Sequence, residues 1–165
     1  RENHIPFFGI CMGMMAMAIE YARNVLQLQD ASSTEFNSET PHPIFYLPEQ
    51  HPDPDHYGNG MMRLGLYQEH LLPGTKIETY YHTTEIQERH SHQYDFNPAY
   101  RDIFEKSRMA LSGFSADGKY LESIELNDHP FMIGVMFNPE FLSRPNRPHP
   151  VFSAFIHAAF IKSNP

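Results

Sequence analysis

The only cysteine of the chain is its strongest candidate nucleophile, and it lies between a predicted strand and a predicted helix. The apolar run 5–10 predicts a buried parallel strand, and apolar side chains recur at helical spacing from Gly13 onward. Gly9 and Gly13 flank Cys11 and permit a tight turn of the kind that presents a nucleophile. The helix amino terminus favours a thiolate, so we predict a reactive Cys11 with a pKa somewhat below that of a free thiol. The alternative is an inert cysteine at the end of a buried strand.

A second segment with chemical potential is 135–141, an apolar strand that ends in a sharp turn carrying Asn138 and Glu140. Together with Cys11, Glu140 supplies two of the three parts of a Cys-His-Glu hydrolase. The middle part is missing, because Asn138 stands where a histidine is expected. An amide has no pKa near neutrality, so Asn138 can neither accept a thiol proton nor protonate a leaving group.

The two segments resemble a known family. Residues 9–15, G-I-C-M-G-M-M, are similar to the G-I-C-L-G-M-Q motif of class I glutamine amidotransferases, and residues 137–141, F-N-P-E-F, are similar to their F-H-P-E-F. Further stretches resemble the glutaminase domains of CTP synthases in particular, nearly from end to end: Ile19 to Leu26, Ser33 to Phe36, Met62 to Gly65, Glu88 to Asn97 and Phe141 to Pro145.

The resemblance implies an α/β fold, the flavodoxin-like fold of class I glutamine amidotransferases, with a central, mostly parallel sheet flanked by helices. It implies that residues 1–165 are the carboxy-terminal two thirds of one such domain. The amino-terminal part of the fold, with its first strand and its glycine-rich oxyanion loop, is then expected upstream of residue 1. An unfilled oxyanion hole costs around 10²- to 10³-fold in rate.

The resemblance also implies a mechanism. In the family the cysteine attacks the side-chain amide of glutamine, the histidine moves protons, and the glutamate orients the histidine. Cys11 matches the nucleophile and Glu140 the orienting acid. The released ammonia would pass to a synthetase domain, in cis or in trans, that converts UTP to CTP. We expect no cofactor in this domain itself; ATP and Mg would be bound only by a linked synthetase domain, and homo-oligomers would form through that domain.

The departures from the family pattern gather at the site. Asn138 replaces the proton-transfer histidine, and losing a general acid or base typically costs roughly 10²- to 10⁴-fold in rate. Met15 replaces a glutamine that helps to hold the substrate, and Met136 replaces another polar residue. Ser91 and Gln93 stand where the family has arginines, one of which binds the substrate carboxylate; neither replaces a bidentate cation at equal affinity.

Part of the substrate site is retained, since Glu35 matches a glutamate that the family uses on the substrate amino group. The candidate catalytic residues are therefore Cys11, Asn138 and Glu140. The candidate substrate-binding residues are Met12, Met15, Glu35, Arg89 and Ser91. Glutamine is a possible partner, but we expect its binding to be weak.

Two functional hypotheses follow, and whether the chain is an active enzyme stays open between them. The favoured hypothesis is a pseudoglutaminase, which keeps the fold for assembly or regulation after losing glutamine hydrolysis. The alternative is an active or slow glutaminase that supplies ammonia to a CTP synthase synthetase domain, another side chain having replaced the histidine. A cysteine peptidase is disfavoured, because segments such as 141–145 are similar to CTP synthases.

The elements that position these residues can be placed from pattern alone. Residues 29–60 are polar and rich in proline, and predict a surface excursion with one short strand near 44–47. Further strands are predicted at 61–66, 76–82, 90–96, 109–115, 120–126 and 131–137, with a hairpin turn at Asp117-Gly118. A short helix is expected from Asn97-Pro98 to about Lys106. A last helix from Pro150 should pack its apolar residues on the sheet: Val151, Phe152, Phe155, Ile156, Ala159 and Phe160.

Composition favours one ordinary domain: 165 residues, 41% hydrophobic, with a formal net charge of -8 and one cysteine. The negative charge argues against a nucleic-acid or anionic-membrane partner, and no stretch approaches the 18 apolar residues of a membrane span. One cysteine points to a reducing compartment, so a cytoplasmic location is expected.

The eleven histidines could suggest a metal site, but their arrangement in the sequence does not support one. His90 and His92 alternate on a predicted strand and share a face, whereas Asp95 has the opposite parity. Zinc usually requires three or four ligands with further support. Partly exposed or hydrogen-bonded histidines are the simpler interpretation, and core packing is the simpler one for the methionine-rich segment 12–17.

Overall fold

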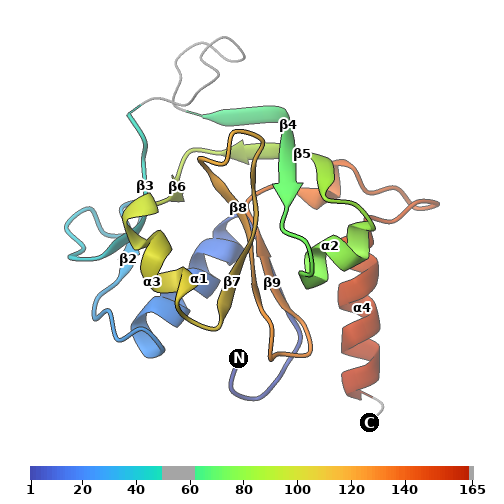
Figure 1. Cartoon of the computed structure of the whole chain (residues 1–165), viewed down its shortest axis with the longest axis horizontal. Helices are drawn as coiled ribbons and strands as arrows, with labels where there is room; N and C mark the ends of the chain where they lie inside the picture. Colours follow the sequence, from blue (N-terminus) through green and yellow to red (C-terminus); the bar gives the residue numbers. More distant parts are fainter. Residues whose placement is uncertain (50–61, 164–165) are drawn as a thin grey trace.

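A computed structural model describes residues 1–49 and 62–163 of the chain (Figure 1). The helices are α1 (Met12–Asn24), α2 (Lys76–Tyr81), α3 (Arg101–Glu105) and α4 (Pro150–Ser163), with 3-10 turns η1 (Pro98–Tyr100) and η2 (Pro139–Phe141). The strands are β1 (Phe7–Ile10), β2 (Ser32–Ser33), β3 (Pro43–Tyr46), β4 (Arg63–Leu71), β5 (Glu85–His92), β6 (Asp95–Phe96), β7 (Met109–Ser115), β8 (Leu121–Leu126) and β9 (Met132–Val135). The chain thus has the α/β character that its sequence predicts.

A six-stranded sheet in the order β1-β9-β8-β7-β4-β5 forms the centre of the fold. The expectation of a mostly parallel sheet is wrong for the described strands: β1 and β9 pair in parallel, but the other four neighbouring pairs are antiparallel. The reason lies in the connections. Tight turns join β7 to β8 and β8 to β9, and a tight turn can join antiparallel strands but not parallel ones. The predicted turn at Asp117-Gly118 is confirmed, with Gly118 at a φ of 73°.

The segment 76–82, predicted as a strand, is instead the helix α2 (Lys76–Tyr81) followed by His82 in a left-handed conformation. Two interactions hold the amino terminus of α2. The Thr75 side chain accepts from the Glu78 amide, and the buried Glu125 carboxylate accepts from the amides of Lys76 (2.8 Å) and Ile77 (3.1 Å). A capped helix amino terminus satisfies donors that a strand would have to pair elsewhere, so these contacts override the β-prone composition.

The predicted strand at 90–96 is displaced in the structure. The strand β5 begins earlier and ends at His92, and β6 is a separate short strand of a small second sheet with β3 and β2. The predicted strand at 61–66 corresponds to β4, which continues to Leu71; residue 61 lies outside the described residues. The predicted short strand near 44–47 is confirmed as β3, and the helix expected after Asn97 is confirmed as η1 and α3.

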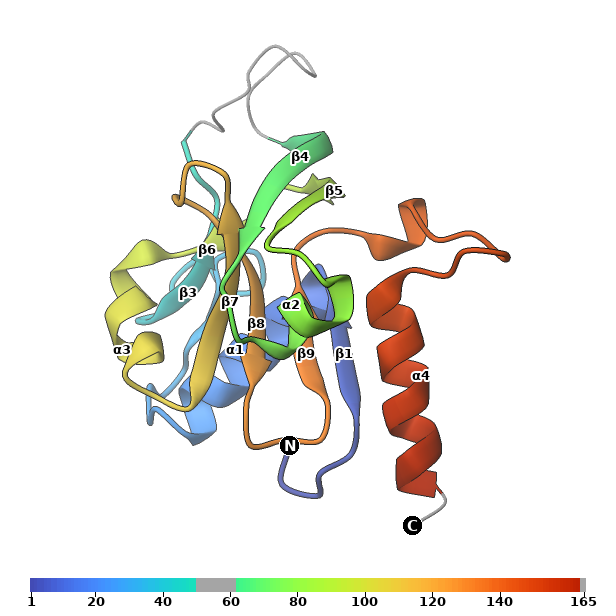
Figure 2. The same ribbon diagram turned by 45° about the vertical axis from the view of Figure 1, so that its right-hand side comes forward.

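The core forms on both faces of the central sheet. On one face α1 packs against β9 and the small sheet, and the methionines of α1 are buried there, Met14 at 0% and Met15 and Met17 at 2% exposure. On the other face α2 and α4 cover β1 and β9, as Figure 2 shows. Core packing is therefore confirmed for these methionines; Met12, at the start of α1, is 53% exposed.

The last helix, α4, is present as predicted but buries less of its surface than expected. Phe155 packs against Phe8 and Phe131, with ring centroids 6.1 and 5.5 Å away. Ile156 and Phe160 point away from the sheet and are 65% and 66% exposed, so their predicted packing is wrong. The helix is apolar on more than one side, so the hydrophobic pattern alone could not select the buried face.

Candidate active site

Cys11 lies in the turn between β1 and α1, in a conformation that few non-glycine residues adopt, with φ 50° and ψ -106°. The Cys11 amide donates to the Val135 carbonyl (2.7 Å), and the Cys11 carbonyl accepts from the amides of Met14 (3.0 Å) and Met15 (3.2 Å). A strained backbone of this kind costs on the order of 1–3 kcal/mol and persists only where its surroundings enforce it. The turn presents the thiol at the amino terminus of a buried helix, as the sequence predicts.

Close packing around the turn depends on one of the two flanking glycines. A Cβ at Gly9 would lie 2.5 Å from the carbonyl carbon and oxygen of Gly13 and 2.8 Å from the Met14 amide nitrogen. A Cβ at Gly13 would meet nothing within 4 Å. Gly9 is therefore required for the approach of α1 to β1, whereas Gly13 is not required by contact.

The thiol of Cys11 is not activated in the way that the sequence predicts. Burial raises its pKa and is the largest influence; the Met12 amide, which bonds to the sulfur, lowers the pKa but does not compensate. The carboxylates of Glu35 and Glu140 raise it further. The prediction of a lowered pKa is therefore wrong in direction, because desolvation and two negative charges outweigh the hydrogen bond from the Met12 amide.

We expect this raised pKa to be visible in the alkylation of Cys11 by iodoacetamide. Thiolate is the reacting form, so a raised pKa shifts the rate increase to higher pH. The rate, followed by mass spectrometry of the Cys11 peptide from about pH 6 to about pH 10, should reach its midpoint above that of a short unstructured peptide with one cysteine and blocked ends, measured in parallel. A midpoint below that of the peptide would contradict the expectation and restore the sequence-based one.

A cavity of about 200 Å³ opens beside the thiol. It brings together residues from α1, from the segment after β2 and from the end of β5: Cys11, Met12, Met15, Glu35, Ser91, His92, Gln93 and Tyr94. All but His92 and Tyr94 belong to the site positions that the sequence indicates. Met15 forms a buried wall, whereas Glu35 is exposed at the rim. The site is thus a small, partly apolar cavity with one carboxylate among its described lining residues.

The other candidate residues lie outside the lining of this cavity. Asn138 is held from both sides: its backbone amide donates to the Arg89 carbonyl (2.8 Å), and its side-chain Nδ2 donates to Glu140 Oε1 (2.8 Å). The Asn138 Oδ1 atom is buried and has no hydrogen-bond partner. Arg89 is exposed on β5. The Glu140 carboxylate is therefore bonded to an amide at the position where the family has a histidine.

His92, which lines the cavity, also belongs to a buried ionic cluster that sequence reasoning missed. His90 Nδ1 and His92 Nε2 are 3.0 Å apart, and His90 Nε2 is 2.7 Å from Glu69 Oε1. Arg63 NH1 lies 2.6 Å from Glu122 Oε1, and all these side chains are almost fully buried. Burial is the main cause that raises the pKa of Glu69 and of Glu122 and lowers that of His90. The alternation of His90 and His92 was the available signal; the acids come from strands distant in sequence.

Among the described residues, His90, His92 and Glu122 offer ligand atoms within 4.8 Å of one another, a spacing that a metal ion could bridge. These atoms already have partners. The two imidazoles bond to each other, and the Arg63 guanidinium lies against the Glu122 carboxylate. A fixed cation at that distance opposes a second one. We therefore assign no metal to this cluster.

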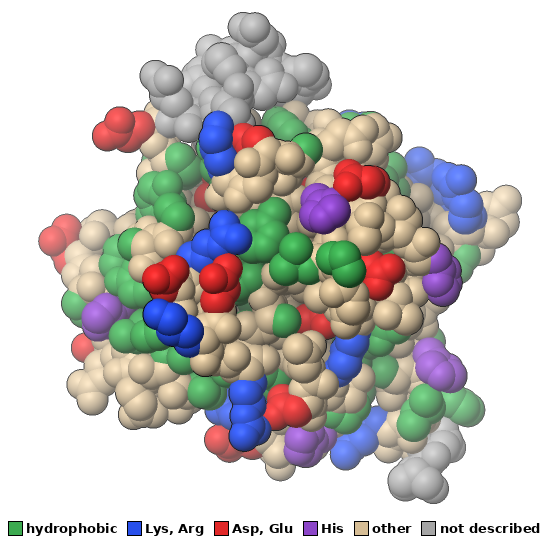
Figure 3. Space-filling model, viewed as in Figure 1, with side chains coloured by type: hydrophobic (Ala, Val, Ile, Leu, Met, Phe, Trp, Pro, Cys, Tyr) green, Lys and Arg blue, Asp and Glu red, His purple; other side chains and the backbone are tan. Residues whose placement is uncertain are grey.

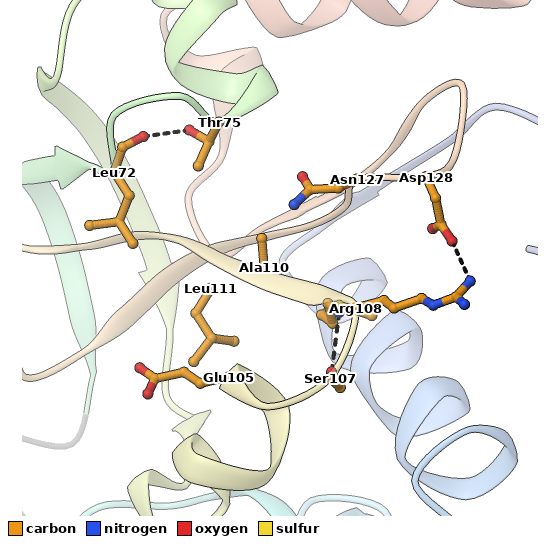
Figure 4. A pocket seen from close by; sticks show the side chains of 10 residues that line it. Leu72, Thr75, Glu105, Ser107, Arg108, Ala110, Leu111, Asn127 and Asp128 are labelled. Atoms are coloured by element: carbon orange, nitrogen blue, oxygen red, sulfur yellow. Dashed lines mark hydrogen bonds and ion pairs between the residues drawn. The ribbon is translucent and has the colours of Figure 1, made fainter.

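A second, larger cavity of about 670 Å³ lies over β7, near α3 and the β8–β9 turn (Figure 4). Its floor is apolar, with Leu111 and Ala110, and an ion pair between Arg108 and Asp128 (2.9 Å) lies at its margin. None of the described residues that line it is a cysteine or a histidine. On the face of the molecule drawn in Figure 3, basic and acidic side chains are interspersed. The smaller cavity at Cys11 is therefore the candidate site for nucleophilic chemistry.

The fold and the cysteine turn define a class of protein, and comparison with known proteins agrees. The family "Glutamine amidotransferase class-I" matches residues 1–158, so the chain belongs to the class I glutamine amidotransferases. Within that family it is a glutamine amidotransferase domain of the CTP synthase type. It is 51% identical over 160 residues to a CTP synthase of Ruminiclostridium cellulolyticum and 48% identical over 159 residues to one of Staphylococcus saprophyticus. These matches cover 97% and 96% of this chain and 30% of each relative.

Solved structures support the same assignment. The glutaminase domain of Trypanosoma brucei CTPS with bound acivicin superposes with a TM-score of 0.86 at 31% identity, over 96% of this chain and 61% of that one. A putative GMP synthase protein from Thermoplasma acidophilum, at 14% identity and a TM-score of 0.61 over 99% of this chain and 61% of that one, shares the fold. The expected α/β fold of the class I glutamine amidotransferases is thus confirmed, with a mixed rather than a mostly parallel sheet in the described residues. No helix in the described ranges has the length and hydrophobicity to cross a bilayer.

Proposed function

We propose that this chain is a pseudoglutaminase: a CTP-synthase-type glutamine amidotransferase domain whose glutamine hydrolysis is lost or strongly impaired. The observation that carries the proposal is the pair of Asn138 and Glu140, bonded at 2.8 Å. Glu140 is positioned to orient a side chain, but the side chain beside it is an amide that cannot exchange a proton near neutral pH. The raised pKa of Cys11 adds to the defect, because the thiol needs a base and has none at this position.

The substitutions within the cavity support the same proposal. Ser91 and Gln93 line the cavity where the family uses arginine, and Met15 forms its buried wall where the family uses glutamine. A hydroxyl and an amide replace a charge-assisted pair that contributes about 1.5–3 kcal/mol to binding. The domain would then keep its fold for assembly or regulation. A synthetase domain, in cis or in trans and with its own ATP and Mg, would depend on free ammonia.

One observation favours the alternative, a slow glutaminase. His92 lines the cavity together with Cys11, so it is the described imidazole placed to take over proton transfer. Both of its ring nitrogens are engaged, Nε2 with His90 (3.0 Å) and Nδ1 with the Tyr94 carbonyl (3.2 Å). Service as a base would require His92 to break one of these bonds, each of which contributes about 1 kcal/mol.

The proposal is tested by ammonia release from glutamine, comparing the protein with its Cys11→Ala variant. We expect the two rates to agree, because no hydrolysis should depend on the thiol. Glutaminases of ordinary efficiency turn over at about 1–10³ s⁻¹, so release in that range that disappears in Cys11→Ala would refute the pseudoglutaminase. Slow, Cys11-dependent release that is lost in His92→Gln would support the alternative.

A further inference from the structure

The charges around the cavity are of one sign. Among the described lining residues, Glu35 is the carboxylate, and no lysine or arginine is present. Glu140 lies close enough for its charge to act on the same thiol as that of Glu35. Arg89 is exposed and is not among the lining residues. A ligand entering this cavity therefore experiences a negative potential at the rim and at the sulfur, which attracts cations and repels anions.

The remaining lining of the cavity is uncharged. Met12 and Met15 give an apolar wall beside the sulfur, and Met15 is 2% exposed. Ser91 and Gln93 give a hydroxyl and an amide from the end of β5. These groups can accompany a methylene chain or bond to a neutral polar group. A ligand carboxylate there would lose water and gain no counter-charge, which is unfavourable for an ion.

We propose that the Cys11 cavity selects ligands that carry an ammonium group and lack a carboxylate, such as short ω-amino amides, over α-amino acids. The ammonium group would pair with Glu35 at the rim, the methylene chain would lie along Met12 and Met15, and a neutral polar end would reach the Cys11 side. This inference rests on the proposed function, since it names what a cavity that no longer anchors glutamine would accept.

The charge preference is measured on the protein with thiol reagents whose end groups carry opposite charges. The Cys11 sulfur displaces methanesulfinate from a methanethiosulfonate: the new S–S bond forms, the S–SO₂ bond breaks, and the thiol proton passes to solvent. The measured quantity is the rate with the 2-aminoethyl reagent divided by the rate with the 2-sulfonatoethyl reagent. We expect this ratio to be at least about tenfold higher for Cys11 than for N-acetylcysteine, because a unit charge a few ångströms away attracts the first reagent and repels the second. The readout is mass spectrometry of the Cys11 peptide.

Variants assign the preference to its source. Glu35→Gln removes the rim charge and should reduce the preference to within about threefold of that of N-acetylcysteine. Glu39→Gln removes an exposed carboxylate from the same segment that does not line the cavity, and should leave the preference unchanged. Gln93→Arg adds a cation to the cavity and should reduce the preference relative to the wild type. An unaltered wild-type preference in Glu35→Gln would overturn the inference.

Protection experiments test the ligand class directly and separate this inference from the proposed function. We expect 4-aminobutanamide at millimolar concentration to slow the labelling of Cys11 by iodoacetamide. The glutamine concentration that halves the labelling rate should be at least about fivefold higher than that of 4-aminobutanamide. Equal or better protection by glutamine would overturn the inference even where ammonia release stays independent of Cys11. Cys11-dependent hydrolysis would refute the proposed function even where the charge preference holds.

Discussion

In the full-length protein, Asn138→His is expected to raise the rate of glutamine hydrolysis at least about 100-fold, because it restores a group that titrates near neutral pH. The geometry is prepared for it. Asn138 Nδ2 donates to Glu140 Oε1 at 2.8 Å, and in histidine the Nδ1 atom is attached to the same Cγ position. A histidine there can give its Nδ1–H to Glu140 and leave Nε2 as the base. The measurement is ammonia release by both proteins at the same glutamine concentration.

Two controls make this result specific. Asn138→Gln lengthens the side chain without adding a titratable group, and should leave the rate unchanged. Asn138→His combined with Cys11→Ala should remove the gain, because the restored base has no nucleophile to act on. Equal rates in the wild type and in Asn138→His would contradict the pseudoglutaminase proposal and would indicate that another side chain, such as His92, already moves the proton.

Arg63→Ala is expected to lower the free energy of unfolding by about 3–5 kcal/mol, the usual result of removing one partner from a buried ion pair. Arg63 is 1% exposed, and its NH1 atom lies 2.6 Å from Glu122 Oε1 and 3.8 Å from Asp95 Oδ1. Its guanidinium also lies over the ring of Tyr67, 4.8 Å from the centroid. The variant leaves two buried carboxylates without this cation. Urea unfolding followed by circular dichroism measures the change.

A surface pair provides the matched control. Arg108 and Asp128 form an ion pair of 2.9 Å with side chains 82% and 51% exposed, so Arg108→Ala should change the stability by less than about 1 kcal/mol. A loss below about 1 kcal/mol in Arg63→Ala as well would show that the cluster is neutralised by protons rather than by Arg63.

The pH dependence of stability gives an independent check on the same cluster. Burial raises the pKa of Asp95 to about 7, with Arg63 opposing the shift. A raised carboxyl pKa means that the folded state holds a proton that the unfolded state has released. The stability contributed by this proton is complete below the unfolded pKa of about 3.9 and is lost as the pH rises through about 7. Asp95→Asn should flatten the profile in that window.

Sequence predicted the parts of the site that depend on local pattern. The Cys11 turn follows from an apolar run, a glycine at position 9 and helical periodicity after it, and the structure places all of these as expected. The differences from the family at Ser91 and Gln93 could be detected in the sequence because both residues interrupt a family motif. Their meeting with Met15 and Glu35 in one cavity followed from the family resemblance rather than from any periodicity.

What sequence could not predict depends on groups that are far apart in the chain. The direction of the Cys11 pKa shift is set by burial and by Glu35 and Glu140, which no local pattern brings to the sulfur. The helix at 76–81 depends partly on Glu125, a residue of β8. Its local signal, Thr75 three positions before Glu78, was present but was outweighed by β-prone residues in the same stretch.

The pairing of β1 with β9 also has a consequence for the order of folding. Phe7 lies opposite Met132, and the Cys11 amide bonds to Val135, so the nucleophile turn is completed by a strand from the other end of the sequence. Closing so long a loop is slow, because the entropy cost is incurred before β1 and β9 form any favourable contact with each other. The thiol should therefore acquire its strained conformation and its protection among the last steps of refolding, and a proteolytic fragment without β9 should carry Cys11 as an ordinary, freely reactive cysteine.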